Sequence, residues 1–330
     1  MRTPKSPSGY RIGIINPLTL VGTEIRSIMR ERGFPYGKLE LLDSSGQATG
    51  ALTEMAGEPM VVASVSQEGL DDLDLVFFCG PPATNKDWIE RHTEDGFIAI
   101  DVSQPSLAED GTLVVADLNI DAADGSSVLI SPHPIAIPMA LILHQIGTLS
   151  AVETCVATVI QPASEFEQAG VEELARQTVS VLNVDSVPKE VFDRQVAFNL
   201  YPAASGNEPF IVSQIQALTT TDLALSLFVT QGTIFHSHTF SMFVKTRKPL
   251  DQEAIVEALA ANAAFAFAEG DQQFGTIDAA GRDEVLIAEV RPDPVIRNGV
   301  WVWAVCDNLR RASALNAVLA AERALSVTPS

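Results

Sequence analysis

The feature that most constrains this chain is an alternation of short apolar strand patterns with helical patterns over residues 11–146. Arg11–Ile15 is a β-branched run, followed by a turn at Asn16–Thr19, a helical pattern from Gly22 to Arg32 and a strand-like segment at Lys38–Leu42. The pattern then repeats, with strands at Leu75–Cys79, Phe97–Asp101 and Leu129–Ser131 and helices at Asn85–Thr93 and Ile135–Ile146. Strands joined through helices predict a doubly wound, Rossmann-like parallel sheet in an α/β fold.

Beyond residue 132 the apolar segments are longer and favour a second α+β domain with a large, mostly antiparallel sheet. Val152–Gln161 and Leu223–Phe235 are apolar and β-branched, and Trp301 and Trp303 share one face of a strand pattern. We expect a Rossmann-like domain at 11–132, a second domain at 133–308, and a C-terminal helix at 309–326 that packs back on the first domain. Residues 1–10 are rich in Pro and Ser and predict a disordered lead without the apolar core of a signal peptide.

Charge and cysteine content exclude several kinds of protein. Forty-two acidic and 21 basic residues give a net charge of −21, which disfavours binding to nucleic acid or to anionic membranes. The longest apolar run, Ile135–Leu143, contains Pro138 and is too short to span a bilayer. The three cysteines lie far apart in sequence and match no disulfide framework or zinc spacing. We therefore expect a cytoplasmic protein without a metal site.

Three longer segments carry a family resemblance. They are GVEELARQT at Gly170–Thr178, DRQVAFNLYP at Asp193–Pro202, and Asp278–Glu322 with its DAAGRDEV, RPDP and NGVWVWAVCDNLRRASALNAV stretches. Together with the strand–helix–strand opening, they resemble aspartate-semialdehyde dehydrogenases over essentially the whole chain, and more narrowly the Usg-type members, which have the dehydrogenase architecture without the full catalytic equipment. The resemblance implies a nucleotide-binding domain, a second domain that forms a homodimer through its sheet, and a C-terminal helix that returns to the first domain.

The position that the resemblance assigns to the nucleophile is occupied by proline. The family reaction needs a cysteine thiolate to attack the aldehyde, and that cysteine lies in an N-P-N-C-S turn before a helix. Here the matching turn reads Ser131-Pro132-His133-Pro134-Ile135, which places Pro134 at the cysteine position. Proline has no nucleophilic atom and is favoured in the first turn of a helix. Cys79, Cys155 and Cys306 are better interpreted as small buried hydrophobic residues than as substitutes.

The other catalytic positions of the family are partly kept. His238 matches its general base, and Gln161 matches its active-site glutamine. The two arginines that hold anionic groups correspond to Gln231 and Leu107, neither of which carries a charge. A structural alternative for His236 and His238 is a hydrogen-bonded pair, or a chance chelate, on one face of a strand.

The cofactor positions also differ from the family. Its glycine-rich phosphate turn corresponds to Asn16-Pro17-Leu18-Thr19-Leu20-Val21-Gly22, in which only Gly22 is kept. The next strand end is Cys79-Gly80-Pro81-Pro82, and the glycine-containing segment after Gln161 is Ser164-Glu165-Phe166-Glu167. Asn16, Thr19, Gly22 and Asn308 are the remaining candidate cofactor positions, and the carboxylates are expected to disfavour NADP.

The sequence leads to one preferred hypothesis and two alternatives. The preferred one is a catalytically inactive family member that acts as a homodimeric binding or scaffold protein without a cofactor. Its dimer surface would also allow mixed dimers with an active paralogue. The first alternative is an active NADP-dependent semialdehyde dehydrogenase, or an oxidoreductase acting on another aldehyde through His238 and Gln161. The second is a regulatory site for a cationic or uncharged metabolite, lined by Glu165, Glu167, His133 and His236.

Overall fold

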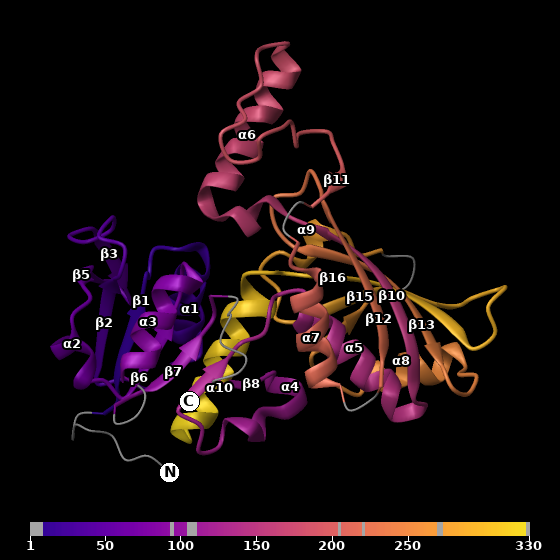
Figure 1. Cartoon of the computed structure of the whole chain (residues 1–330), viewed down its shortest axis with the longest axis horizontal. Coiled ribbons are helices and arrows are strands. Elements are labelled where there is room, and N and C mark those ends of the chain that lie inside the picture. Colours follow the sequence, from indigo (N-terminus) through magenta and orange to yellow (C-terminus); the bar gives the residue numbers. More distant parts are fainter. Residues whose placement is uncertain are drawn as a thin grey trace. The chain divides into compact units, whose positions relative to one another are not determined.

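The structure is a computed structural model that describes residues 9–92, 96–103, 111–203, 206–219, 222–268 and 273–327. The chain forms two compact units (Figure 1). Unit 1 comprises Met1–His133 and Ser313–Ser330, and unit 2 comprises Pro134–Ala312. Most of the expected lead, residues 1–8, lies outside the described residues. None of the helices in the described ranges is both long and apolar enough to cross a bilayer.

Unit 1 contains a seven-stranded sheet in which every neighbouring pair is parallel, as the strand–helix alternation predicts. In spatial order the strands are β5 (Ala63–Ser64), β2 (Lys38–Asp43), β1 (Arg11–Ile15), β6 (Leu75–Phe78), β7 (Ile98–Asp101), β9 (Val128–Ile130) and β8 (Thr112–Leu113). All four residues of β6 are buried, because a parallel sheet of this kind is covered on both faces. The strand order reverses at β1 and β6, where doubly wound sheets usually bind ligands beyond the carboxyl ends of the strands.

The remaining elements of unit 1 cover this sheet. They are α1 (Leu20–Glu31), the hairpin β3 (Leu52–Met55) and β4 (Glu58–Val61), α2 (Gln67–Asp71), α3 (Pro82–His92), α4 (Ala116–Asn119), the 3₁₀ turn η1 (Ile120–Ala123) and α10 (Asn316–Leu325). Helix α10 completes the core from the far end of the chain, because Ala317, Val318, Ala321 and Leu325 are buried together with residues of β1, β6 and β7. The side chain of Asn316 anchors this helix by donating to Val114 O and Ser131 Oγ.

Unit 2 contains a mixed seven-stranded sheet in which antiparallel pairs are the majority. Its order is β11 (Tyr201–Pro202), β12 (Ala224–Gln231), β10 (Val152–Gln161), β13 (His238–Thr246), β16 (Gly299–Cys306), β15 (Val285–Pro292) and β14 (Phe265–Phe267). The other elements are α5 (Ala136–Leu149), the 3₁₀ turn η2 (Ala163–Phe166), α6 (Glu167–Asn183), α7 (Glu208–Leu218), α8 (Gln252–Ala260), α9 (Thr276–Ala279) and a π-helical turn at Arg310–Leu315. The predicted strand at Leu223–Phe235 ends at Gln231, before the turn that leads into β13.

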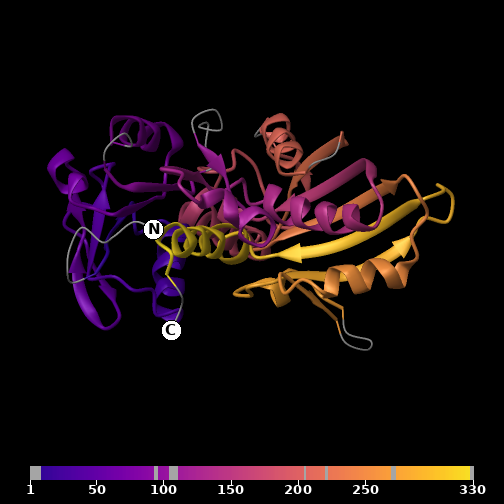
Figure 2. The same cartoon turned by 90° about the horizontal axis from the view of Figure 1, so that it is seen from below.

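The two faces of this second sheet differ. Helices α5, α7 and α8 lie along one face (Figures 1 and 2), which buries alternate residues such as Val159, Phe240 and Ala304. On much of the opposite face the strands are not covered, and Val156, Phe228 and Trp303 remain 47%, 50% and 38% exposed. We call this opposite face the open face. Side-chain alternation along a strand places chemically different residues on the two sides.

A helical extension, here called the arm (residues 167–200), consists of α6 and the loop after it (Figure 1). Two buried side chains of α6 hold the loop. Glu173 accepts hydrogen bonds from the backbone N–H groups of Glu190, Val191 and Phe192, and Gln177 accepts from those of Val196 and Ala197. Gln177 thereby bonds the two segments that carry the sequence resemblance, GVEELARQT and DRQVAFNLYP, to each other.

Candidate functional site

Three of the predicted site residues meet in unit 2, at one end of the covered face of the sheet. Gln161 is paired in register with Gln231 on β12, and Val159, two residues before it, is paired with Phe240 on β13. His238 lies two residues before Phe240 and is itself paired with Cys306 on β16. Because side chains alternate along strands, Gln231, Gln161, His238 and Cys306 form one row across four adjacent strands. We call these four residues the polar row.

The two glutamines of the polar row are bonded to each other. Gln161 Nε2 donates to Gln231 Oε1 at 2.9 Å, and Gln231 Nε2 donates to the carbonyl oxygens of Gln161 and Gly232 at 3.3 and 3.1 Å. The amide donors of Gln231 are therefore used within the strands, and its neutral side chain offers no charge for a carboxylate or phosphate.

His238 is fully buried and faces a carboxylate. Its Nε2 lies 3.5 Å from Oε1 of Glu165, a residue of the turn η2. Asn308 holds this arrangement together, since its Nδ2 donates to Glu165 Oε1 at 3.1 Å and its Oδ1 accepts from the backbone N–H of Ser237 at 3.0 Å. Ser164 is also bonded to the Asn308 side chain. Asn308, a candidate cofactor residue in the sequence, thus lies in unit 2 and organises the surroundings of His238.

His236 and His238 do not share one face of a strand, so this structural alternative was wrong. Strand β13 begins at His238, and His236 belongs to the preceding turn. Ser237 between them has a φ of 76°, a left-handed conformation that breaks the extended backbone. Within the described ranges, no group of three or more His, Cys, Asp or Glu side chains is arranged to hold a metal ion.

All three cysteines are buried, and none of them forms a disulfide. Burial raises the pKa of the Cys155 thiol to about 12. Burial also raises the pKa of Cys306 far above its usual value, an effect that the nearby Arg311 opposes and Asp307 reinforces. The thiol of Cys306 is therefore next to a histidine in the polar row but is held in its protonated form, which is the weaker nucleophile.

The turn that precedes α5 contains the proline predicted at the nucleophile position. Pro134 and Ile135 form this turn, and α5 begins at Ala136. Pro134 is buried, as is His133 directly before it. Burial lowers the pKa of His133 from its usual 6.5 to about 3, so this imidazole is neutral near pH 7.

In unit 1 the residues of the predicted phosphate turn lie together, and they form hydrogen bonds with one another. Asn16 adopts a φ of 54° at the end of β1, and Thr19 Oγ1 accepts from the N–H of Gly22, which caps α1. A Cβ on Gly22 would lie only 2.8 Å from Asn16 O and 2.9 Å from Thr19 Oγ1, so this position accepts only glycine without rearrangement. Pro17 lacks an N–H group, which further reduces the number of donors that could face a phosphate.

The side chain of Asn16, directly after β1, bonds to the residues that follow β2 and β6. Its Nδ2 donates to Cys79 O at 2.8 Å and to Ser44 Oγ at 3.0 Å, while its Oδ1 accepts from the N–H of Ser44. A Cβ on Gly80 would lie 2.6 Å from Asn16 Nδ2, which shows how closely the amide packs. A dinucleotide phosphate binds to free backbone N–H groups of a glycine-rich turn, and the Asn16 bonds, Pro17 and the Thr19 cap do not fit that arrangement.

The carboxylate of Asp43, at the end of β2, is also engaged within the protein. It accepts hydrogen bonds from Ser45, Ala48 and Thr49. Burial raises its pKa, but these hydrogen bonds outweigh burial and lower the net value to about 2. The carboxylate is thus an anion near pH 7, and an anion at the end of this strand disfavours a phosphorylated ribose. Leu107, the predicted second clamp position, lies outside the described residues.

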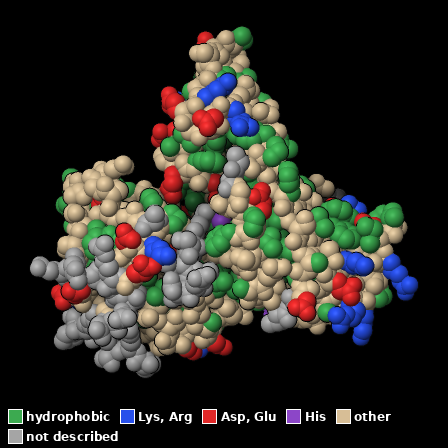
Figure 3. All heavy atoms as spheres, viewed as in Figure 1, with side chains coloured by type: hydrophobic (Ala, Val, Ile, Leu, Met, Phe, Trp, Pro, Cys, Tyr) green, Lys and Arg blue, Asp and Glu red, His purple; other side chains and the backbone are tan. Residues whose placement is uncertain are grey.

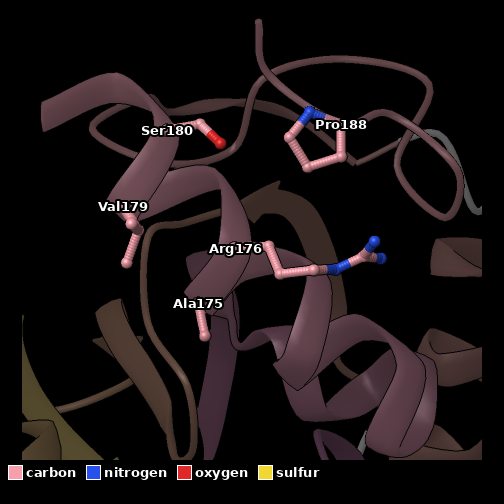
Figure 4. A pocket seen from close by; sticks show the side chains of 5 residues that line it. All are labelled: Ala175, Arg176, Val179, Ser180 and Pro188. Carbon is pink, nitrogen blue, oxygen red and sulfur yellow. The ribbon is translucent and has the colours of Figure 1, made fainter. Parts of the chain in front are cut away.

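A pocket of about 450 Å³ lies on the arm, away from the polar row. Ala175, Arg176, Val179 and Ser180 line it from α6, and Pro188 lines it from the following loop (Figure 4). Arg176 forms an exposed ion pair with Glu190 at 2.8 Å. The walls are chiefly aliphatic, and the pocket contains none of the residues predicted for catalysis.

Sequence reasoning placed Glu165 near a nucleotide and gave Cys306 no role, although both lie beside His238. Cys306 could have been found only from the register of β13 against β16, which pairs it with His238. Glu165 lies only four residues after Gln161, which could have indicated that it belongs to the same site. Its contact with His238, however, depends on η2 and on Asn308.

Comparison with known proteins gives consistent matches along the chain. Residues 11–126 match the family model described as semialdehyde dehydrogenase, NAD binding domain, and residues 143–311 match the one described as semialdehyde dehydrogenase, dimerisation domain. The aspartate-semialdehyde dehydrogenase of Rickettsia bellii is 25% identical over 328 residues, covering 95% of this chain and 97% of that protein. A USG-1 protein homolog of Azotobacter vinelandii is 29% identical over 324 residues, covering 94% and 96%.

A solved structure supports the same relationship. Aspartate semialdehyde dehydrogenase II from Vibrio cholerae superimposes with a TM-score of 0.91 at 26% sequence identity, covering 96% of this chain and 99% of that one.

Proposed function

Because the chain belongs to the semialdehyde dehydrogenase family, we propose that it is a member that has lost the catalytic cysteine and the dehydrogenase reaction and acts as a homodimeric binding or scaffold protein. The observation that carries this proposal is Pro134 in the turn before α5, where the family resemblance requires a thiolate. Without a nucleophile, His238 can hold or move a proton but cannot start covalent catalysis. The chain is also similar to a USG-1 protein homolog, which agrees with the narrower resemblance of its sequence to Usg-type members.

The contacts of Asn16 and Thr19 in unit 1 support the proposal that the protein binds no dinucleotide. Asn16 bonds to the residue that follows β6, and the cap formed by Thr19 uses a donor of α1. We therefore assign no reaction step to NADP. Neutral Gln231 at a position where the family carries a charged clamp adds an independent obstacle to an anionic substrate.

The decisive experiment is an assay with NADP, aspartate semialdehyde and phosphate. We expect the purified protein to form NADPH no faster than a variant in which Cys79, Cys155 and Cys306 are all replaced by serine. A missing nucleophile removes the covalent route and costs several kcal/mol of transition-state stabilisation. A clear excess of activity over the cysteine-free variant would refute the proposal.

An active oxidoreductase is the second candidate, and one observation favours it. Cys306 is paired in register with His238, so a thiol does lie next to the retained base. If the protein turns over an aldehyde and Cys306→Ser alone abolishes the activity, this candidate replaces the first. The raised pKa of Cys306 opposes it, because catalysis needs the thiolate.

The open face of unit 2 is the surface we propose for the homodimer. It exposes Val156, Phe228 and Trp303, with Phe243 paired in register to Trp301 beside them. Figure 3 shows exposed hydrophobic side chains in several places on the side of unit 2 that faces the viewer. Large exposed apolar surface on a folded domain usually marks an interface. The match to a dimerisation domain over residues 143–311 supports this assignment.

Replacing Phe228 with glutamate should weaken the dimer by roughly 30-fold or more, because a large aromatic at an interface centre contributes about 2 kcal/mol or more. Sedimentation equilibrium measures this change directly. Leu52→Glu is the matched control, since Leu52 is 76% exposed on the hairpin of unit 1. Equal dissociation constants for Phe228→Glu and Leu52→Glu would place the interface elsewhere.

The same surface could also take an active paralogue, which the proposal includes as a mixed dimer. We propose a cytoplasmic location, which the three buried cysteines support, since none of them forms a disulfide.

A further inference from the structure

We propose that Glu165 is an internal ligand that occupies a carboxylate-binding site formed by His238 and Asn308, and that this contact keeps the site closed to external ligands. The inference deepens the proposed function, because it states what fills the former catalytic region of unit 2. The ligand class of the site is a small monocarboxylate, which the Glu165 side chain imitates.

The contacts around Glu165 are those of a bound carboxylate. Its Oε1 accepts from Asn308 Nδ2 at 3.1 Å and lies 3.5 Å from His238 Nε2, while His238 is fully buried and the Glu165 side chain is 10% exposed. An amide N–H that donates to one carboxylate oxygen, with an imidazole nitrogen close to the same oxygen, is an arrangement that suits a carboxylate.

The site is held together by contacts that do not involve Glu165. Asn308 Oδ1 accepts from the N–H of Ser237, and Asn308 Nδ2 also donates to Ser164 Oγ. These bonds fix the Asn308 amide between η2 and the turn before β13. Removing the Glu165 side chain should therefore leave the site in place.

Ser237, the residue before His238, adds a buried hydroxyl to this region. Ser237 is fully buried, and its Oγ has no hydrogen-bond partner among the described residues, although its backbone N–H belongs to the same network. A buried hydroxyl without a partner is costly and points to an absent acceptor.

The C-terminal end of the turn that carries Glu165 lies at the surface, whereas Ala163 and Ser164 at its start are buried. Phe166 and Glu167 at this end are exposed, and Glu167 has a φ of 57°, which is unfavourable for a residue other than glycine. Rotation of the Glu165 side chain toward this exposed end of the turn would displace its carboxylate, while Ser164 keeps its bond to Asn308.

The charges around the site are mixed. Arg311 and Asp307 both act on Cys306, which is paired in register with His238, so a buried cation and an anion lie nearby. The negative charge of Glu165 itself would suit a cationic ligand. The experiment below separates a site for carboxylates from a site for cations.

The test is chemical rescue of a Glu165→Ala variant. We expect its Tm to fall by roughly 3–8 °C, the shift for losing one or two charge-assisted hydrogen bonds. Acetate at about 100 mM should restore at least half of this loss, because a ligand that binds only the folded state stabilises it. Acetamide has the same shape without the charge and should restore nothing.

Two controls set the background. Glu172→Ala removes an exposed glutamate of α6, and neither it nor the wild-type protein should gain stability from acetate beyond the general effect of salt. Equal stabilisation of all three proteins by acetate would overturn the proposal. Stabilisation of the wild-type protein by methylammonium would also overturn it, in favour of a cation site at Glu165.

If Glu165→Ala does not fold, Glu165→Gln decides the question. This variant keeps the size of the side chain, and the proposal requires the His238 ring resonances in NMR spectra to shift relative to the wild-type protein. Unchanged resonances would show that Glu165 does not act on His238. None of these readouts depends on dehydrogenase activity, so failure here leaves the proposed function standing.

Discussion

Lowering the pH from 7 to 5 should destabilise the wild-type protein by about 2 kcal/mol more than it destabilises a His133→Gln variant. Burial lowers the pKa of His133 to about 3, whereas the unfolded chain keeps the ordinary value of 6.5. Between pH 6.5 and 3, His133 is therefore protonated in the unfolded state but neutral in the folded state. The stability contributed by neutral His133 is complete above pH 6.5 and is lost progressively as the pH falls toward 3, at about 1.4 kcal/mol per pH unit.

Calorimetric unfolding at several pH values between 7.5 and 4 measures this difference. His144→Gln is the matched control, because His144 is exposed on α5, and it should follow the wild-type curve. Asp43, whose folded pKa is about 2, loses its contribution only below pH 4 and so does not interfere in this range. Parallel curves for the wild-type protein and His133→Gln would mean that water reaches His133.

Replacing Glu173 with alanine should release the loop of the arm. The carboxylate accepts three backbone N–H bonds, and its loss would leave the donors of Glu190, Val191 and Phe192 without their partner. Hydrogen bonds to a charged group contribute about 1.5–3 kcal/mol each, so a combined local loss of about 3–4 kcal/mol is a conservative expectation. The corresponding amide exchange should accelerate by about 10²–10³-fold.

Hydrogen exchange of residues 184–200 checks this result, with Glu172→Ala on the exposed face of α6 as the control. Glu173→Gln should be nearly as harmful as Glu173→Ala. Both carboxylate oxygens accept from the backbone, and a carboxamide would turn one of them into a donor that faces other donors. Unchanged exchange in Glu173→Gln would show that one acceptor is enough and that the packing of Phe192 and Val196 holds the loop.

The parts of the fold that follow from local pattern could be predicted from the sequence. The strand and helix segments of unit 1 and the mainly antiparallel second sheet both follow from hydrophobic periodicity. Gln161 and His238 were assigned through family motifs, and the pairing of their strands brings them onto one face.

What could not be predicted depends on contacts between distant segments. The strand pattern around His236 gave no sign of the left-handed conformation at Ser237, which removes His236 from β13. The contact between Glu165 and His238 depends on Asn308, which is 143 residues from Glu165 in the chain. Composition and spacing carry no information about such a contact, because tertiary packing alone creates it.

The route of the chain through unit 1 has a consequence for biosynthesis. Helix α10 belongs to the core of this unit but is encoded after all of unit 2. While the chain emerges from the ribosome, the side of the first sheet that α10 covers stays exposed until residues 313–325 have been synthesised. Unit 2 is complete in sequence before that moment, so the later half of the protein can mature first and the earlier half last.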